Sequence, residues 1–411
     1  MTNFQFQVSS LFTCSLLCAC NVDSPPGSTG GVHLVEQGRC ERALVVVMTD
    51  YSSTNVGITE LDGTPRSPSF ISSAAAKPGL ALALSGDVDA PRTAPASGRV
   101  VLLDRFGKNV VTWLDPTSAE VLAQLPVGTG FESNPQDYLE YQGHWAMVSR
   151  FGSNPHPGQQ AYDAGGDLLI LDTDTPAIVD RIAMPEEDPN LLPRPSGMTQ
   201  LSDTIVVSLG RLSADFHAVG SGRFVGVSPE SKTLLWTVDI DGVKNCGRLA
   251  LSPSGKLGAI ACSSQFDSVT YRYNPDESDV VLFDMTVTPP VELRRLGLGK
   301  TLDAGLQPTL EFASESKLIA LTYGGNATTG DRAVAVDAEV GTVQSLFQTT
   351  KPYSVSGVHC APGCGDVCVI SDAESGNLHR YRVSATGEFT ALEDVKVDDS
   401  IGLPPHAIGA I

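Results

Sequence analysis

The feature of this sequence that most constrains its fold is an internal repeat. One unit recurs along the chain: an alternating apolar strand, a polar loop, a second strand that often ends in Asp, a turn and a third strand. The units are rich in β-branched residues with period-2 patterning, and none carries a long helical stripe. The copies occupy residues 43–50, 99–126, 144–184, 204–240, 256–298, 317–347 and 366–397. We therefore expect an all-β repeat array.

A short additional strand precedes every copy after the first, so each complete unit has four strands. These leading strands are expected at residues 79–85, 136–141, 196–201, 246–252, 308–313 and 354–360. The units start 45 to 61 residues apart, and four strands at about this spacing are typical of a propeller blade. Seven such units fit the length of the chain. A pair of β-sandwiches is the alternative, because it also consists of short, regularly spaced strands.

The two ends of the repeat array complement each other. The first unit lacks its leading strand, and residues 403–411 resemble the inner strand of the other units, for example residues 134–139. If the C-terminal segment completes the first blade, the ring closes and leaves no sheet edge open. We therefore predict a seven-bladed β-propeller over residues 39–411, made of four-stranded antiparallel blades and closed by its C-terminal strand.

Residues 99–137 also resemble a known repeat. A strand that ends in Asp-Pro precedes a turn, a Val-rich strand, then Val-Gly and Asn-Pro, and Arg105-Phe106-Gly107 recurs as Arg150-Phe151-Gly152. This pattern is similar to the YVTN-type repeat of seven-bladed propellers in bacterial surface and periplasmic proteins, although the literal Tyr-Val-Thr-Asn string is absent. The resemblance implies a rigid, exported recognition or scaffold module. Related lactonase-like and cofactor-carrying propellers are enzymes.

The N-terminal segment has the pattern of an export signal. Residues 8–19 form an apolar run of 12 residues, which is too short to span a bilayer but suits the centre of a signal peptide. The run leads into Leu-Cys-Ala-Cys, which resembles a bacterial lipobox that ends at Cys20, although residues 1–38 contain no Lys or Arg. We predict a lipoprotein signal peptide at 1–19, lipidation of Cys20 and a flexible tether at 20–38. An ordinary cleaved signal peptide is the alternative.

These features place the protein in the bacterial cell envelope, anchored by lipid. Asn21, directly after the predicted lipidated cysteine, suggests the outer membrane on a sorting rule taken from the family. The 27 Lys and Arg residues are outnumbered by 47 Asp and Glu residues, which gives a formal charge of −20. Phosphate-rich partners bind clusters of Lys and Arg. We therefore exclude nucleic acid as a partner and expect membrane contact through the N-terminal lipid only.

Six of the nine cysteines follow the predicted leader and its Cys20, and an even number in an exported protein indicates disulfides. Cys246 and Cys262 are equidistant from Ser254, at the centre of a predicted turn. They should therefore face each other across the two strands of a hairpin.

The other four cysteines allow two interpretations. Cys360, Cys364 and Cys368 are evenly spaced beside His359, which could indicate zinc, but a second cysteine pair is missing. In a closed propeller, Cys40 and Cys364 would lie at equivalent turns of neighbouring blades. We therefore predict a Cys40–Cys364 bond across the seam and a Cys360–Cys368 bond within a hairpin, although six cysteines permit fifteen pairings.

The candidate binding residues lie where the second strand of a blade ends and the innermost strand begins, which is one face of the propeller. They are Arg105, Arg150 and Arg211 at equivalent positions of blades 2, 3 and 4, and Asn134, Asp137 and His406 at the starts of innermost strands. Guanidinium groups suit planar oxyanions. The three arginines could therefore line the channel mouth and bind a carboxylate, a phosphate or an acidic glycan. Alternatively, each pairs with an aspartate of a neighbouring blade, for example Asp104 or Asp137, and ties blades together.

The leading functional hypothesis is a non-catalytic propeller that binds a ligand or a protein partner through its loop face. The sequence has no convincing nucleophile, base or metal set, so we expect neither a cofactor nor a metal. The first alternative is a lactonase-like enzyme, which a buried His406 or Asp137 facing the channel would favour. The second is a structural subunit of an envelope complex, which predicts an exposed apolar patch on the rim.

Overall fold

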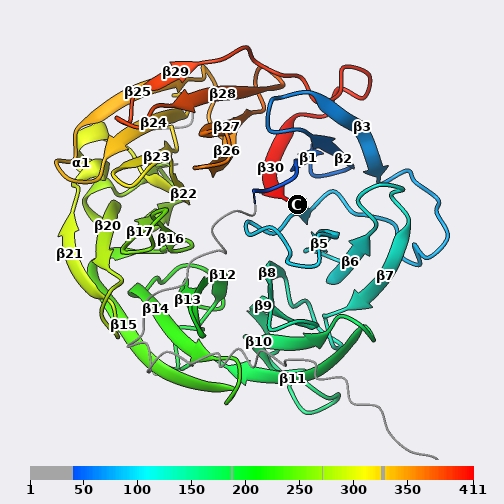
Figure 1. Cartoon of the computed structure of the whole chain (residues 1–411). Helices are drawn as coiled ribbons and strands as arrows, with labels where there is room; N and C mark the ends of the chain where they lie inside the picture. Colours follow the sequence, from blue (N-terminus) through cyan, green and yellow to red (C-terminus); the bar gives the residue numbers. More distant parts are fainter. Residues whose placement is uncertain (1–39, 187, 271, 325–328) are drawn as a thin grey trace, which may run out of the picture. The chain divides into compact units, whose positions relative to one another are not determined.

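In the described part of the chain, all strands but the pair β18 and β19 form seven four-stranded antiparallel sheets, arranged as blades around a common axis (Figure 1). The computed structural model describes residues 40–186, 188–270, 272–324 and 329–411. The predicted signal peptide, Cys20 and the tether lie outside the described residues. The seven-bladed propeller is therefore confirmed, and the pair of β-sandwiches is excluded. In the described part of the chain, no helix is both long and apolar enough to cross a membrane.

In each of the first four blades, the four strands lie side by side from the axis to the rim. From the innermost strand outward, blade 1 consists of β30 (Pro405–Ala410), β1 (Leu44–Thr49), β2 (Thr54–Thr59) and β3 (Pro65–Ser72). Blade 2 consists of β4 (Val88–Asp89), β5 (Val100–Asp104), β6 (Val110–Leu114) and β7 (Val121–Pro126). Blade 3 consists of β8 (Pro135–Tyr141), β9 (Trp145–Ser153), β10 (Gly165–Asp172) and β11 (Ala177–Ala183). Blade 4 consists of β12 (Pro195–Leu201), β13 (Thr204–Leu209), β14 (Ser221–Ser228) and β15 (Thr233–Lys244).

The last three blades follow the same order, with short insertions in blade 5. Blade 5 consists of β16 (Ala250–Leu251), β17 (Leu257–Cys262), β20 (Asp279–Asp284) and β21 (Val291–Arg295). Its insertions are the hairpin β18 (Phe266–Asp267) and β19 (Arg272–Tyr273), the 3-10 turn η1 (Pro275–Glu277) and the helix α1 (Leu298–Leu302). Blade 6 consists of β22 (Leu306–Phe312), β23 (Lys317–Thr322), β24 (Arg332–Asp337) and β25 (Val343–Gln348). Blade 7 consists of β26 (Val355–Ala361), β27 (Val367–Asp372), β28 (Asn377–Val383) and β29 (Phe389–Ala391).

The C-terminal strand closes the ring, as predicted. β30 pairs antiparallel with β1, with Leu44 opposite Ala410 and Val46 opposite Ile408 (Figure 1). The Ile411 amide donates a further hydrogen bond to the Ala43 carbonyl at 3.0 Å. The last strand of the chain therefore becomes the innermost strand of the first blade, and neither strand is left as an open edge.

The apolar core lies between the blades. Seven clusters of buried apolar side chains each join two neighbouring blades, and together they run around the whole ring. The second strand of a blade is covered on both faces, so β1 reads LVVVMT and is buried along its full length. The outermost strands face solvent, and β21 is exposed at all five residues. Side-chain burial thus holds the blades in a fixed arrangement around the axis.

All three predicted disulfides are present. Cys246 pairs with Cys262 and Cys360 with Cys368, each across its own hairpin. Cys40 pairs with Cys364, and their sequence separation is 324 residues. This third bond joins the segment before β1 to the turn between β26 and β27, so it locks blade 7 to blade 1. The zinc interpretation of this cysteine cluster is therefore wrong.

The leading strand of blade 2 differs from the prediction. Residues 79–85 form a loop, and the strand β4 comprises only Val88 and Asp89. The Asp104 carboxylate at the end of β5 accepts hydrogen bonds at 2.7 Å from both the amide and the hydroxyl of Ser85. These bonds direct the chain across the end of β5, so pairing begins only at Val88, opposite Asp104.

The seam disulfide should stabilise the fold more than the hairpin disulfide of blade 7. Removing a crosslink restores entropy to the unfolded chain, and this entropy grows with the logarithm of the loop length. The two loops span 324 and 8 residues. We expect the double variant Cys40→Ser/Cys364→Ser to lose about twice as much free energy of unfolding as Cys360→Ser/Cys368→Ser. Denaturant titration of both variants measures this, and equal losses would show that β30 alone determines the stability of the seam.

Candidate functional site

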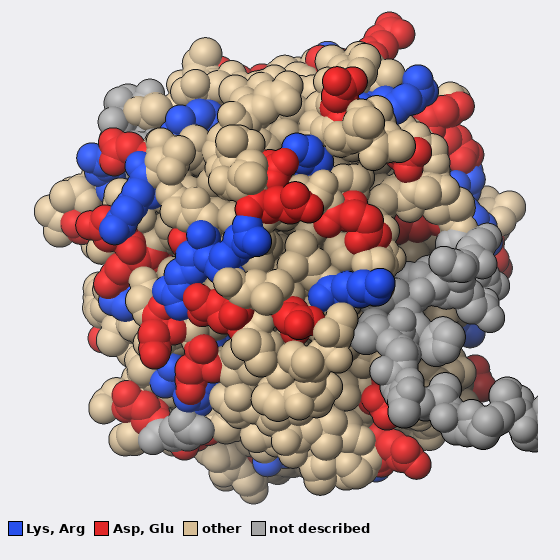
Figure 2. Space-filling model, turned by 60° about the vertical axis from the view of Figure 1, so that its left-hand side comes forward, with Lys and Arg blue, Asp and Glu red and all other residues tan. Residues whose placement is uncertain are grey.

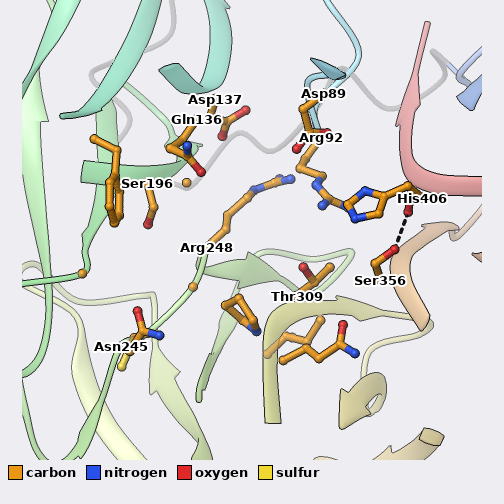
Figure 3. A pocket seen from close by; sticks show the side chains of 18 of the residues that line it. Asp89, Arg92, Gln136, Asp137, Ser196, Asn245, Arg248, Thr309, Ser356 and His406 are labelled. Atoms are coloured by element: carbon orange, nitrogen blue, oxygen red, sulfur yellow. Dashed lines mark hydrogen bonds between the residues drawn. The ribbon is translucent and has the colours of Figure 1, made fainter. Parts of the chain in front are cut away.

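A cavity of about 500 Å³ opens on the axis, at the face where the innermost strands begin (Figure 3). Every blade contributes to its lining from the start of its innermost strand. In chain order these residues are Asp89, Asp137, Gly197, Arg248, Thr309, Ser356 and His406. The ring geometry explains the convergence, because all seven innermost strands enter from the same side.

A second set of side chains reaches the cavity from the loops of this face. Tyr51, Arg105, Phe151 and Tyr323 stand where the second strands end, and Tyr273 and Tyr353 come from loops of blade 5 and before blade 7. Tyr273 and Tyr323 stack with ring centroids 4.3 Å apart. One wall of the cavity is therefore aromatic, and the wall beside His406 is polar.

The three arginines predicted to form one arc have different environments. Arg105 lines the cavity and pairs with two carboxylates of its own blade, Asp87 at 2.5 Å and Asp89 at 3.3 Å. Arg150 is fully buried and forms a bidentate pair with Asp167, at 2.7 and 2.8 Å. Because Arg150 has no exposed surface, it cannot meet a dissolved ligand.

Arg211 also lies outside the cavity lining. Its guanidinium donates a hydrogen bond at 3.1 Å to the carbonyl of Ser221, which lies on the next strand of the same blade. The proposed arc of three arginines is therefore corrected to Arg105 alone. The alternative is corrected as well, because Arg105 and Arg150 pair with aspartates of their own blades and not with Asp104 or Asp137.

Asn134 and Asp137 have different positions. Asn134 does not line the cavity, and its side-chain oxygen accepts a hydrogen bond at 2.6 Å from the Gln136 amide. Asp137 does line the cavity, and its carboxylate accepts the Met198 amide of the next blade at 2.8 Å. Burial raises the pKa of Asp137, and the positive charges of nearby arginines, Arg248 first, oppose this shift. Asp137 therefore joins two blades and places a carboxylate in the wall.

Two arginines that the sequence analysis did not select point into the cavity, Arg92 and Arg248 (Figure 3). Arg248 donates hydrogen bonds to two hydroxyl groups, to Thr199 at 3.1 Å and to Thr93 at 3.3 Å. Thr93 belongs to blade 2, so the Arg248 side chain extends across the axis from blade 5.

Each of these arginines carries one buried nitrogen, Nη1, without a hydrogen-bond partner among the described residues. For Arg248, the nearest carboxylate is that of Glu311, at 4.0 Å. A buried donor without an acceptor costs free energy, so it is rare unless a ligand or water completes it. The two guanidinium groups together form an incomplete binding site for an oxyanion.

The imidazole of His406 faces the same space. Its Nε2 lies 2.6 Å from the hydroxyl oxygen of Tyr51, and the Ser356 hydroxyl donates a hydrogen bond at 2.9 Å to the His406 carbonyl. Burial lowers the pKa of His406, and the nearby carboxylate of Asp89 opposes this shift while Arg105 adds to it. His406 is therefore neutral at pH 7 and can accept a proton.

The sequence pattern could have identified Arg248 as a cavity residue, but it could not have identified Arg92. Arg248 stands within the predicted leading strand 246–252, at a position that corresponds to cavity residues of other blades. Arg92 follows the very short strand β4 in a proline-rich segment, and the leading strand of that blade was predicted too early.

Comparison with known proteins supports the fold. No known protein-family pattern matches the sequence, and no curated protein matches it. Among solved structures, a putative 6-phosphogluconolactonase from Bacteroides uniformis is similar, with a TM-score of 0.57 and 14% identity over 91% of this chain and 100% of that one. A periplasmic gluconolactonase of Pseudomonas aeruginosa has a TM-score of 0.54 and 14% identity over 90% of this chain and 98% of that one. A protein from Lactobacillus plantarum has a TM-score of 0.57 and 12% identity over 91% of this chain and 100% of that one. At such identities the likeness shows a shared fold, and membership of the YVTN-type family stays a prediction.

The two partly buried histidines His406 and His379 should titrate in opposite directions. Burial lowers the pKa of His406. Burial also opposes charge on His379, but its hydrogen bonds to Asp372 and Asp394 outweigh this effect and raise its pKa. We expect NMR titration of the ring protons to place His406 below 6.5 and His379 above it. A His406 pKa above 6.5 would contradict a neutral imidazole in the cavity.

Proposed function

We propose that the protein is a lactonase-like hydrolase that binds an anionic lactone in the axial cavity and opens its ring. The observation that carries this proposal is the pair of incompletely bonded guanidinium groups, Arg92 and Arg248, beside the neutral imidazole of His406. The two guanidinium groups suit binding of an anion, and the imidazole suits proton transfer to and from a reacting oxygen. The lactonases among the structural neighbours support the same reaction class.

The arginines account for binding. A carboxylate or phosphate on the substrate would accept hydrogen bonds from the buried Nη1 atoms and remove the cost of leaving them unpaired. The carboxylates of Asp89, Asp137 and Glu311 lie in the same lining, so the cavity is not uniformly positive. A ligand with one anionic group therefore suits this cavity better than a polyanion, which these carboxylates would repel.

His406 accounts for the chemistry. In the proposed reaction, its imidazole takes a proton from a water molecule while the water oxygen bonds to the lactone carbonyl carbon. A guanidinium group stabilises the oxyanion that forms, as Arg92 is placed to do. The ring C–O bond then breaks, and the imidazolium returns its proton to the departing ring oxygen. The products are a carboxylic acid, which loses its proton to water, and an alcohol on the same molecule.

We also propose that the protein acts outside the cytoplasm as a lipid-anchored envelope protein. Three disulfides in the described part of the chain support an oxidising compartment. The attachment through Cys20 and the outer-membrane location rest on the N-terminal sequence pattern alone.

The proposed function predicts different effects for three substitutions. Hydrolysis of 6-phosphogluconolactone and glucono-δ-lactone is followed in a pH-stat, with the uncatalysed rate subtracted, and binding of the product acids is measured by calorimetry. Arg248→Ala should weaken binding of the product anion about 10- to 100-fold, because a charge-assisted hydrogen bond is lost. His406→Gln should reduce kcat about 100-fold or more with binding retained.

Arg211→Ala provides the matched control, because this arginine lies outside the cavity lining and should leave both quantities unchanged. For the wild type, the rate should fall only as the pH drops below the lowered pKa of His406, since the neutral imidazole is the active form. Binding of the anions without turnover of either lactone would contradict the enzyme and favour the non-catalytic binding protein.

A further inference from the structure

The exposed aromatic side chains of the protein lie on one face. Among the described residues, five aromatic side chains are strongly exposed. They are Tyr51, Phe106, Phe216, Phe266 and Tyr353, with exposed fractions of 63%, 65%, 55%, 38% and 56%. Each stands on a loop that follows a second strand or leads into an innermost strand, so all five belong to the face of the cavity. We call this set the aromatic rim. The other large exposed apolar residues are aliphatic, and several of them lie on outermost strands.

Three members of the aromatic rim have a costly backbone conformation. Tyr51, Phe216 and Tyr353 have φ angles of 62°, 63° and 57°. This left-handed region is unfavourable for bulky side chains, and glycine would fit it without strain. Such conformations also occur at turns elsewhere in the described chain, for example at Gln142 and Lys232. At the rim they are combined with exposed rings, which glycine would avoid at no steric cost, and this combination supports a role for the rings.

The rim is continuous with the aromatic wall of the cavity. Tyr323 stacks on Tyr273, and Phe266 lies beside Tyr273 with ring centroids 5.2 Å apart. On the other side, Phe216 lies nearly parallel to the cavity residue Phe151, with ring centroids 6.4 Å apart and an interplanar angle of 9°. Such packing fixes the orientation of the rings, so a ligand that stacks on them loses little additional side-chain entropy.

Rings of the rim also lie beyond the cavity. Phe106, Phe216 and Phe266 are not part of its lining, whereas Tyr51 and Tyr353 are. The cavity volume of about 500 Å³ suits one small molecule. A ligand that touches the outer rings must therefore extend out of the cavity and across the loop face.

We propose that this face binds an oligosaccharide with a single acidic terminal unit, which lies in the cavity, and with neutral sugar rings that follow it on the aromatic rim. The placement of the acidic end rests on the proposed function. Sugar rings have flat C–H faces that pack on aromatic rings, and their hydroxyl groups bond to polar neighbours. The exposed carboxylates of Asp50, Asp215 and Asp267 stand next to rim residues and can accept such bonds.

A protein partner fits this arrangement less well. The rings come from blades 1, 2, 4 and 5 and from the loop before blade 7, with charged residues between them. The centre of a protein interface is depleted in charged residues. On the side of the molecule shown in Figure 2, acidic and basic side chains are interspersed.

The experiment is a ligand-length series. Binding of glucuronate, and of xylo-oligosaccharides of two to five units that carry one terminal glucuronate, is measured by calorimetry for the wild type and for Phe106→Ala/Phe216→Gly, which removes two rings outside the cavity. Wild-type affinity should rise about 3- to 10-fold for each ring engaged. The variant should lose this gain for the pentamer, and its affinity for monomeric glucuronate and its lactone hydrolysis should stay within twofold of the wild type. Glycine at position 216 relieves the strained φ angle and so offsets part of the contact that the Phe216 ring makes with Phe151 and Arg194, and the melting temperature should fall by no more than about 3 °C.

Leu235→Ala/Leu293→Ala is the matched control, because it removes exposed apolar side chains from the outermost strands β15 and β21. It should leave the length series unchanged, and neutral maltopentaose should bind more weakly than the acidic pentamer. An affinity that is independent of length, with lactone hydrolysis intact, would overturn this inference and leave the proposed function standing. A length dependence without any lactone hydrolysis would support the rim and contradict the enzyme. A large fall in melting temperature of Phe106→Ala/Phe216→Gly would show that these rings are structural, and it would also overturn the inference.

Discussion

The pairing of β30 with β1 is the interaction on which the other features depend. It joins the two ends of the repeat array, and it also carries His406 to the side of Tyr51, although these residues are 355 positions apart in the sequence. Without this strand pair, blade 1 would lack its innermost strand, and the cavity would lose one of its seven walls. The interaction that completes the fold therefore also supplies the candidate general base.

Charged groups in this protein occur in two contrasting settings. The buried pair of Arg150 and Asp167 is complete, because the guanidinium makes a bidentate contact with the carboxylate inside one blade. On the axis, Arg92 and Arg248 each have one buried nitrogen without a partner among the described residues. Folding alone would favour removal of such groups, because each unpaired donor reduces stability. Among the described residues, Arg194 and Arg380 also have a buried nitrogen without a partner, but neither lines the axial cavity, and two such donors in one cavity support a ligand there.

The sequence predicted the architecture better than the site. Period-2 patterning and repeat spacing identified the blades, and the strand register implied by the ring was sufficient to pair all six cysteines of the described chain. The three arginines at equivalent repeat positions were a weaker basis for prediction. Equivalent backbone positions do not determine where a long side chain points, because its direction depends on the polar groups near it. Asp167, for example, holds the Arg150 side chain inside blade 3. Arg92 was missed because the Ser85–Asp104 contacts shift the start of the strand in blade 2, an interaction between residues that no periodic pattern reveals.

The Cys40–Cys364 bond also determines how a mechanical load at the start of the described chain is carried. Cys364 lies in the turn between an innermost and a second strand, and Cys40 immediately precedes β1, so the covalent junction is on the face away from the cavity. A force applied at Cys40 therefore passes through the sulfur bridge into blade 7 before it can separate β1 from the ring.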